Sequence, residues 1–88
     1  MALSLERGYA LDDRVAVRPE SFGALCYHYG NRRLTFLKSS DIVRVVESLG
    51  AHDTVRDALQ SCGIERVRWP AFVNALASLE ESELIRER

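Results

Sequence analysis

The sequence predicts a small α+β domain in which a three-stranded antiparallel meander precedes three helices. Residues 14–38 hold short apolar and aromatic runs separated by turn residues, which is typical of strands. From residue 39 onward, apolar residues recur at the spacing of helices. The chain has 88 residues, 47% hydrophobic and 28% charged, which suits one folded domain. We expect that domain to span residues 1–88, with residues 1–10 flexible and residues 86–88 as a tail.

The first strand is predicted around Val15 and Val17, which alternate with Ala16 and Arg18 until Pro19 interrupts the pattern. The second and third strands are two apolar runs, at 24–29 and 33–37. Since the chain forms a meander, the third strand is expected at an edge of the sheet.

A hairpin turn is predicted at residues 30–31, because a glycine followed by an asparagine suits a two-residue type II′ turn. This turn pairs Tyr27 with Leu34 and Leu25 with Phe36. Alternation of side chains then separates two faces of the sheet. We expect the core face to hold Leu25, Tyr27, Leu34 and Phe36, and the other face to hold Cys26, His28, Arg33 and Thr35.

Two helices are predicted from repeated apolar spacing. The first begins at the serines of residues 39–40 and ends near Gly50. The second begins at Thr54 and ends near Gly63.

The third helix is predicted from Pro70 to Glu81, since proline suits the first turn of a helix. Its apolar residues cover an arc of roughly 200°, about twice the width that a core-facing helix needs. We therefore expect one edge of the arc to pack on the other helices and the edge around Val73 and Ala77 to line a groove beside the sheet. The alternative is a fully buried helix. Residues 84–85 are either its end or a short extended tail.

Composition excludes several classes of function. Twelve basic and thirteen acidic residues nearly cancel, whereas nucleic-acid-binding domains usually carry a basic excess. A winged-helix DNA-binding regulator is kept as the alternative, although residues 70–79 carry no charge. Two cysteines do not make the disulfide framework of a small secreted domain, and no apolar stretch suits a signal peptide or a membrane helix. We therefore predict a cytoplasmic protein with no nucleic-acid or membrane partner.

No catalytic arrangement is apparent among Asp12, Asp13, His28 and His52, so we predict that the protein is not an enzyme. Cys26 and His28 share a strand face and could supply two metal ligands, but no further ligand follows at a zinc-like spacing. We expect a buried thiol, an exposed imidazole, and no metal or other cofactor.

Residues 14–38, RVAVRPESFGALCYHYGNRRLTFLK, resemble the signature of the peptide chaperones of the mycofactocin system. This family belongs to the precursor-peptide recognition elements and is related to the pyrroloquinoline quinone peptide chaperones. The three-helix remainder of the chain fits the small winged-helix-like fold of that group in order and length.

The resemblance implies a non-enzymatic chaperone that binds the leader region of a ribosomally synthesised precursor peptide. It also implies delivery of that peptide to a radical S-adenosylmethionine maturase in mycofactocin biosynthesis. In the wider family the leader docks as an added strand, beside the third strand and against the third helix. The corresponding peptide-binding residues here are Arg33, Leu34, Thr35, Phe36, Leu37, Lys38, Val73, Leu76 and Ala77.

The residues themselves allow strand addition. The third strand has no proline and no bulge signal, so its outer N–H and C=O groups can pair with an extended peptide. Arg32, Arg33 and Lys38 frame this strand and favour acidic residues in the leader. Each exposed ion pair of this kind contributes about 0–1 kcal/mol and weakens with salt.

Overall fold

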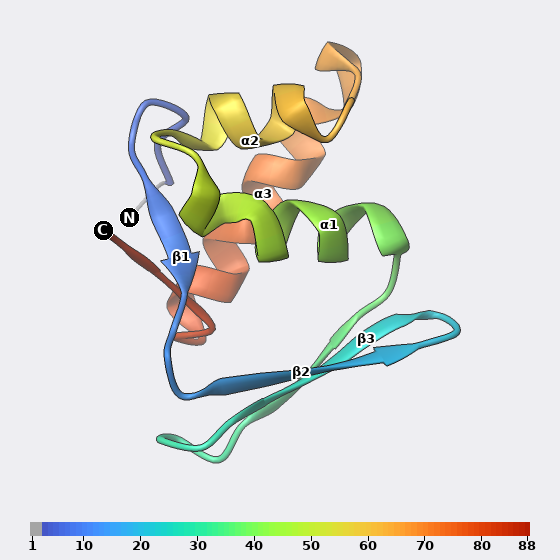
Figure 1. Cartoon of the computed structure of the whole chain (residues 1–88), viewed down its shortest axis with the longest axis vertical. Coiled ribbons are helices and arrows are strands. Elements are labelled where there is room, and N and C mark those ends of the chain that lie inside the picture. Colours follow the sequence, from blue (N-terminus) through green and yellow to red (C-terminus); the bar gives the residue numbers. More distant parts are fainter. Residues whose placement is uncertain (1–2) are drawn as a thin grey trace.

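The computed structural model describes residues 3–88, in which three helices lie on one side of a three-stranded sheet (Figure 1). The antiparallel sheet has the order β2-β3-β4, and a separate antiparallel ribbon joins β1 to β5. The α+β class, the three-stranded meander and the three helices are therefore confirmed. The strands are β1 (Tyr9–Leu11), β2 (Val15–Glu20), β3 (Gly23–His28), β4 (Leu34–Leu37) and β5 (Ile85–Glu87); the helices are α1 (Ser40–Ser48), α2 (Val55–Ser61) and α3 (Trp69–Glu81), with 3-10 turns η1 (Leu49–Ala51) and η2 (Arg66–Arg68).

The predicted helix starts are confirmed in detail for α1 and α2. The Ile42 N–H donates to the Ser39 hydroxyl at 3.2 Å, and the Asp57 N–H donates to the Thr54 hydroxyl at 3.1 Å. These side chains satisfy N–H groups that have no partner within the helix. After α2 the chain reverses at Gly63, whose positive φ of 73° is favourable for glycine.

The pairing of β3 with β4 follows the predicted register, with Tyr27 opposite Leu34 and Leu25 opposite Phe36. The predicted two-residue turn is wrong. His28 and Arg33 close a longer loop through the His28 N–H, which donates to the Arg33 carbonyl at 3.0 Å. A type II′ turn needs a positive φ at its first central residue, but the positive φ in this loop is at Arg32.

The prediction of which sheet face is buried is also wrong. The helices cover the face that carries Ala24, Cys26, His28 and Leu37, all of which are buried. The face predicted as core, with Leu25, Tyr27, Leu34 and Phe36, points away from the helices, and Leu34 and Phe36 are 56% and 54% exposed. Hydrophobicity favoured the wrong side because the larger apolar side chains lie on the face that the helices leave uncovered.

Gly23 allows β3 to begin close to the end of β4. Its φ is +147°, and a Cβ at this position would lie 2.1 Å from the Leu37 carbonyl oxygen. A larger residue would therefore push the two strands apart where β4 leads into α1.

The two terminal segments pair with each other, which the prediction of flexible residues 1–10 and a tail at 86–88 did not include. Ala10 lies opposite Arg86, and Tyr9 is buried. The N-terminal segment also covers the start of α2, where the Val55 N–H donates to the Arg7 carbonyl at 3.0 Å. Residues 1–2 lie outside the described residues. Of the two alternatives for residues 84–85, the extended segment is the one observed, because α3 ends at Glu81 and Ile85 begins β5, which is paired with β1.

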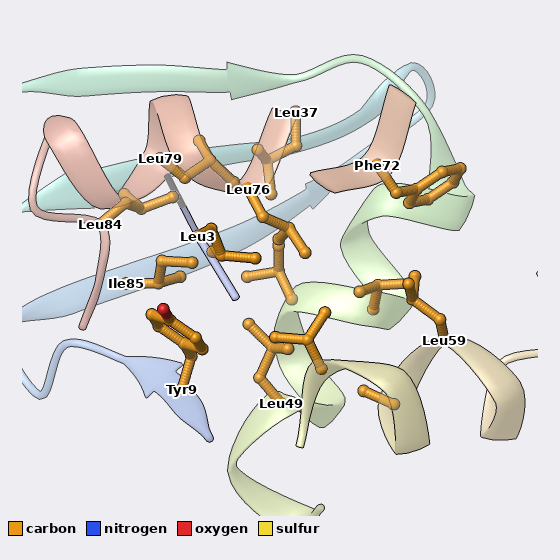
Figure 2. Close-up of a cluster of buried hydrophobic side chains, with 14 of the residues drawn as sticks. Leu3, Tyr9, Leu37, Leu49, Leu59, Phe72, Leu76, Leu79, Leu84 and Ile85 are labelled. Carbon is orange, nitrogen blue, oxygen red and sulfur yellow. The ribbon is translucent and has the colours of Figure 1, made fainter. Parts of the chain in front are cut away.

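One cluster of buried side chains joins the sheet, the helices and both terminal segments (Figure 2). Leu37 comes from β4, Leu49 follows α1, Leu76 comes from α3, and Leu3 and Ile85 come from opposite ends of the chain. The helices are therefore packed on the sheet through side chains that they share with it in one core. None of the helices in residues 3–88 combines the length and the hydrophobicity that crossing a bilayer requires.

Candidate functional site

The outer edge of β4 is open. Within residues 3–88, β3 is the one strand that pairs with β4. Because the His28 N–H donates to the Arg33 carbonyl, the odd-numbered residues of β4 turn their backbone groups toward β3. Leu34 and Phe36 consequently turn their N–H and C=O groups outward. These groups are available to a further strand.

A groove of about 450 Å³ lies between this edge and α3. Its volume is within the range of ordinary ligand sites, roughly 300–1,000 Å³. The end of β4, the start of α1, the last residue of η2 and one face of α3 contribute to it. The lining residues are Phe36, Leu37, Lys38, Ser39, Ile42, Arg68, Ala71, Phe72, Ala75, Ser78 and Leu79.

The deepest part of the groove is apolar. Leu37, Phe72 and Leu79 line it and also belong to the buried core, with 4%, 7% and 7% of their surface exposed. Figure 2 shows these three side chains among the core residues of β4 and α3. A side chain that enters the groove would therefore contact residues that are already packed in the core.

The α3 wall of the groove consists of small residues. Ala71, Ala75 and Ser78 line it, and all three are exposed. They lie on one face of the helix because their spacing of three and four residues follows the helical repeat. Short side chains leave room for another backbone to lie between α3 and β4.

One end of the groove is basic. Lys38 and Arg68 line it next to Ser39, the N-cap of α1. Arg68 forms an ion pair with Asp41 at 3.1 Å. Hydrogen bonds from Arg44 and then from Arg68 lower the pKa of Asp41, so this carboxylate stays ionised and partly neutralises the arginine. Lys38 forms no ion pair within residues 3–88 and remains available to an acidic group.

The predicted strand residues lie at this site. Leu34, Thr35, Phe36 and Leu37 form β4, with Arg33 and Lys38 directly before and after it. Of these, Phe36, Leu37 and Lys38 line the groove. Their role in binding a peptide stays a prediction.

The edge of α3 around Val73 and Ala77 does not line the groove, so this expectation is wrong. A role of Val73, Leu76 and Ala77 in binding a peptide stays a prediction. Val73, Leu76 and Ala77 are not among the residues that line the groove. Leu76 is fully buried, and Val73 and Ala77 pack against the core. The opposite edge of the apolar arc, at Ala75 and Leu79, faces the groove. A helical wheel gives the arc but does not show which edge turns toward β4.

Sequence reasoning missed the small residues and the arginine of the helix wall. Arg68, Ala71, Ala75 and Ser78 follow one another at spacings of three and four, so the signal was present in the sequence. It was not decisive because the spacing does not show how the helix is rotated relative to β4, and because Arg68 precedes Pro70, the predicted start of the helix.

Cys26 and His28, which could have supplied two metal ligands, are both buried side chains of β3. Cys26 is buried as predicted, and burial raises the pKa of its thiol, which keeps it protonated. His28 is also buried, so the predicted exposed imidazole is wrong. Its Nδ1 accepts hydrogen bonds from the N–H groups of Gly30 and Asn31 at 2.9 and 3.1 Å. Residues 3–88 contain no group of three or more His, Cys, Asp or Glu side chains placed to hold a metal ion.

Known proteins resemble this chain over most of its length. A family model described as the peptide chaperone MftB family matches residues 8–86. Peptide chaperone MftB of Mycobacterium ulcerans is 43% identical over 84 residues, covering 96% of this chain and 77% of the relative. The proteins of the same name from Mycobacterium tuberculosis and Mycolicibacterium smegmatis are 40% and 43% identical over 83 and 77 residues, covering 94% and 88% of this chain and 76% of each relative. No solved structure matches the chain significantly.

Proposed function

The chain belongs to the peptide chaperone MftB family, and from this membership we propose that it binds the leader region of a ribosomally synthesised precursor peptide by strand addition to β4. The observation that carries the proposal is the open edge of β4, which borders an apolar groove against α3. An extended peptide laid along this edge gains backbone hydrogen bonds on one side and apolar contacts on the other.

The strand and the groove contribute differently to affinity. The outward N–H and C=O groups of Leu34 and Phe36 allow about four ladder hydrogen bonds, each worth ~1 kcal/mol net. Ordering five or six leader residues costs ~1–2 kcal/mol apiece, which exceeds that gain. Burying two or three leucine-sized side chains contributes roughly 1.5–3 kcal/mol each. The groove therefore supplies most of the affinity, and β4 sets the direction and register of the leader.

The pairing geometry separates the leader side chains into two sets. Residues directly opposite each other in a sheet place their side chains on the same face. Leader residues opposite Thr35 and Leu37 would point into the groove, because these two face the helices. Leader residues opposite Leu34 and Phe36 would point to the uncovered side of the sheet. We therefore expect apolar anchors at alternate positions of the leader.

The charges at the groove favour a leader with an acidic residue near the end of β4. Lys38 and Arg68 lie beside the N-terminus of α1, where the helix dipole also favours a negative group. Arg32 and Arg33 lie at the opposite end of the strand and are exposed. The resulting attraction is modest and decreases with salt.

The bound leader would then be delivered to a radical S-adenosylmethionine maturase in mycofactocin biosynthesis. The chain itself would act as a carrier of the peptide, which agrees with the name peptide chaperone that its relatives carry. It would need no cofactor for this role. The winged-helix-like description and the cytoplasmic location stay predictions. No observation favours the DNA-binding alternative: the exposed wall of α3 at Ala71, Ala75 and Ser78 carries no charge with which to contact phosphates.

Titration calorimetry with the cognate leader peptide tests the proposal. We expect saturable binding with a dissociation constant below tens of micromolar, and a loss of at least tenfold in affinity for Ala75→Glu, which places a charge in the groove. Asn74→Glu is the matched control, since Asn74 is the exposed neighbour and does not line the groove. A wild-type protein that binds no leader, or equal losses in the two variants, would contradict the proposal.

A further inference from the structure

The uncovered face of the sheet carries an apolar patch separate from the groove floor. We define the outer patch as Phe22, Leu25, Tyr27, Tyr29, Leu34 and Phe36. Four of these side chains are well exposed: Phe22 (45%), Tyr29 (67%), Leu34 (56%) and Phe36 (54%). In Figure 1 the helices lie on the opposite side of the sheet and leave this face open. Small monomeric proteins rarely expose a contiguous apolar surface of this kind without using it.

The side chains of the outer patch form an ordered surface. The rings of Phe22 and Phe36 meet edge to face with centroids 6.0 Å apart, and those of Tyr27 and Tyr29 do so at 5.0 Å. Cross-strand pairing places Leu34 directly beside Tyr27. Aromatic side chains held by such contacts lose little conformational freedom when a partner covers them.

The charges around the outer patch distinguish between partners. Residues 14–38, which form the sheet, contain five basic residues and one acidic residue, a net charge of +4, although the whole chain carries −1. Glu20 is bonded to Arg18 and Asp12 to Arg14, which leaves Arg32, Arg33 and Lys38 as the basic residues of this margin that have no ion pair within residues 3–88. A second copy stacked face to face would bring two positive sheets together. Charge therefore favours a different protein, with an apolar centre and an acidic margin.

The outer patch is continuous with the groove. Phe36 and Lys38 line both the groove and a shallow hollow beside Phe22. A protein seated on the outer patch would thus lie next to a leader paired with β4. It would also contact those leader side chains that point to the uncovered side of the sheet.

We infer that the outer patch is the docking surface for the maturase, which covers the apolar centre and presents acidic residues to the basic margin. This inference rests on the proposed function, because it takes the maturase as the second partner. It separates the two interfaces: the leader occupies the edge and the groove, and the maturase occupies the face. One enzyme surface would then contact the chaperone and its bound peptide together.

The double variant Phe22→Thr/Tyr29→Thr tests this assignment. Both residues are exposed and neither lies on β4 or lines the groove, so the fold and leader binding should be unchanged. We expect the affinity for the purified maturase to fall at least tenfold, while the affinity for the leader stays within twofold. Val67→Thr is the control, since Val67 is 84% exposed and lies outside the outer patch, and it should leave both affinities unchanged.

The maturase affinity is measured by interferometry and the leader affinity separately by calorimetry, so failure of leader binding is seen independently of failure at the outer patch. Unchanged maturase affinity in the double variant overturns the inference, as does a wild-type protein that binds no maturase. A loss of leader affinity instead would assign the outer patch to the peptide site. A wild-type dimer in sedimentation that the double variant abolishes would assign it to self-association, and either result overturns the inference.

Discussion

At the scale of single residues, His28 organises the loop that leads into β4. Its Nδ1 accepts two backbone hydrogen bonds from Gly30 and Asn31, so the imidazole proton of the neutral ring resides on Nε2. That Nε2 is buried and has no hydrogen-bond partner within residues 3–88, and an Asp12 carboxylate oxygen lies 3.9 Å away. The ring is therefore held by its two hydrogen bonds from the loop.

Replacing His28 by leucine should destabilise the protein by about 1–2 kcal/mol. Two loop amides lose their acceptor, and this cost is partly offset because the unpartnered Nε2–H is removed as well. His28→Asn keeps an acceptor near the Nδ1 position and should retain more of the loop's hydrogen bonding. Urea unfolding measures the stability, and hydrogen exchange at Gly30 and Asn31 measures the loop. Equally slow exchange of these amides in His28→Leu would show that the imidazole does not hold them.

At the scale of elements, β4 has one edge in use and one edge open. Thr35 turns its N–H toward β3, whereas Phe36 turns its N–H toward the open edge. The backbone of Thr35 therefore holds β4 to β3, whereas the backbone of its neighbour Phe36 is free to pair with an added strand.

Phe36→Pro should weaken leader binding at least tenfold more than Phe36→Ala does, because only proline removes the outward N–H. The fold should tolerate this proline, since edge positions accept one, and stability should change by less than about 1 kcal/mol relative to Phe36→Ala. Thr35→Pro removes a donor to β3 and should cost ~3 kcal/mol or more. Calorimetry with the leader and urea unfolding separate the two effects. Equal leader affinities for Phe36→Pro and Phe36→Ala would exclude strand addition at this edge.

The three helices and the meander of β2, β3 and β4 were predictable from the sequence, because local chemistry determines them. Ser39 and Thr54 begin helices as their capping side chains predict, and β3 pairs with β4 in the predicted register. The buried face of the sheet was not predictable from hydrophobicity. Alternation separates two faces, but the side on which the helices pack depends on the whole chain.

The candidate site was predictable on the strand and not on the helix. The residues around Phe36 were expected on an edge strand and lie on one, because sequence order and register are enough to place an edge strand. The groove wall at Ala71 and Ala75 depends on how α3 is rotated about its own axis relative to β4. The pairing of β1 with β5 was missed because three-residue strands far apart in sequence leave no local signal.

At the scale of the whole molecule, stability should fall in acid because the buried carboxylate of Asp12 is held ionised. Asp12 is buried, and hydrogen bonds from the Arg14 side chain and backbone hold its pKa well below the ordinary value of 3.8. In the unfolded chain Asp12 takes up a proton near its ordinary pKa, whereas in the folded protein it does not. Its contribution is therefore fully present above about pH 5 and is lost progressively as pH falls below about 4.

Asp12→Asn should make the free energy of unfolding less dependent on pH between 6 and 3. The matched control is Asp13→Asn, since the neighbouring Asp13 side chain is 89% exposed and should change the slope little. Urea unfolding at several pH values measures the slopes. The same slope in the wild type and in Asp12→Asn would show that other groups cause the acid sensitivity.

The pairing of β1 with β5 also affects when the protein can fold. Leu3 and Tyr9 pack in the same core as Leu84 and Ile85, although these residues lie at opposite ends of the chain. During synthesis β1 can contact α1 and η1 first, but its pairing with β5 has to wait until residues 85–87 have left the ribosome. These contacts span nearly the whole described chain, so their formation carries a large loop-closure cost, and until they form Leu3 and Tyr9 keep part of their apolar surface in water.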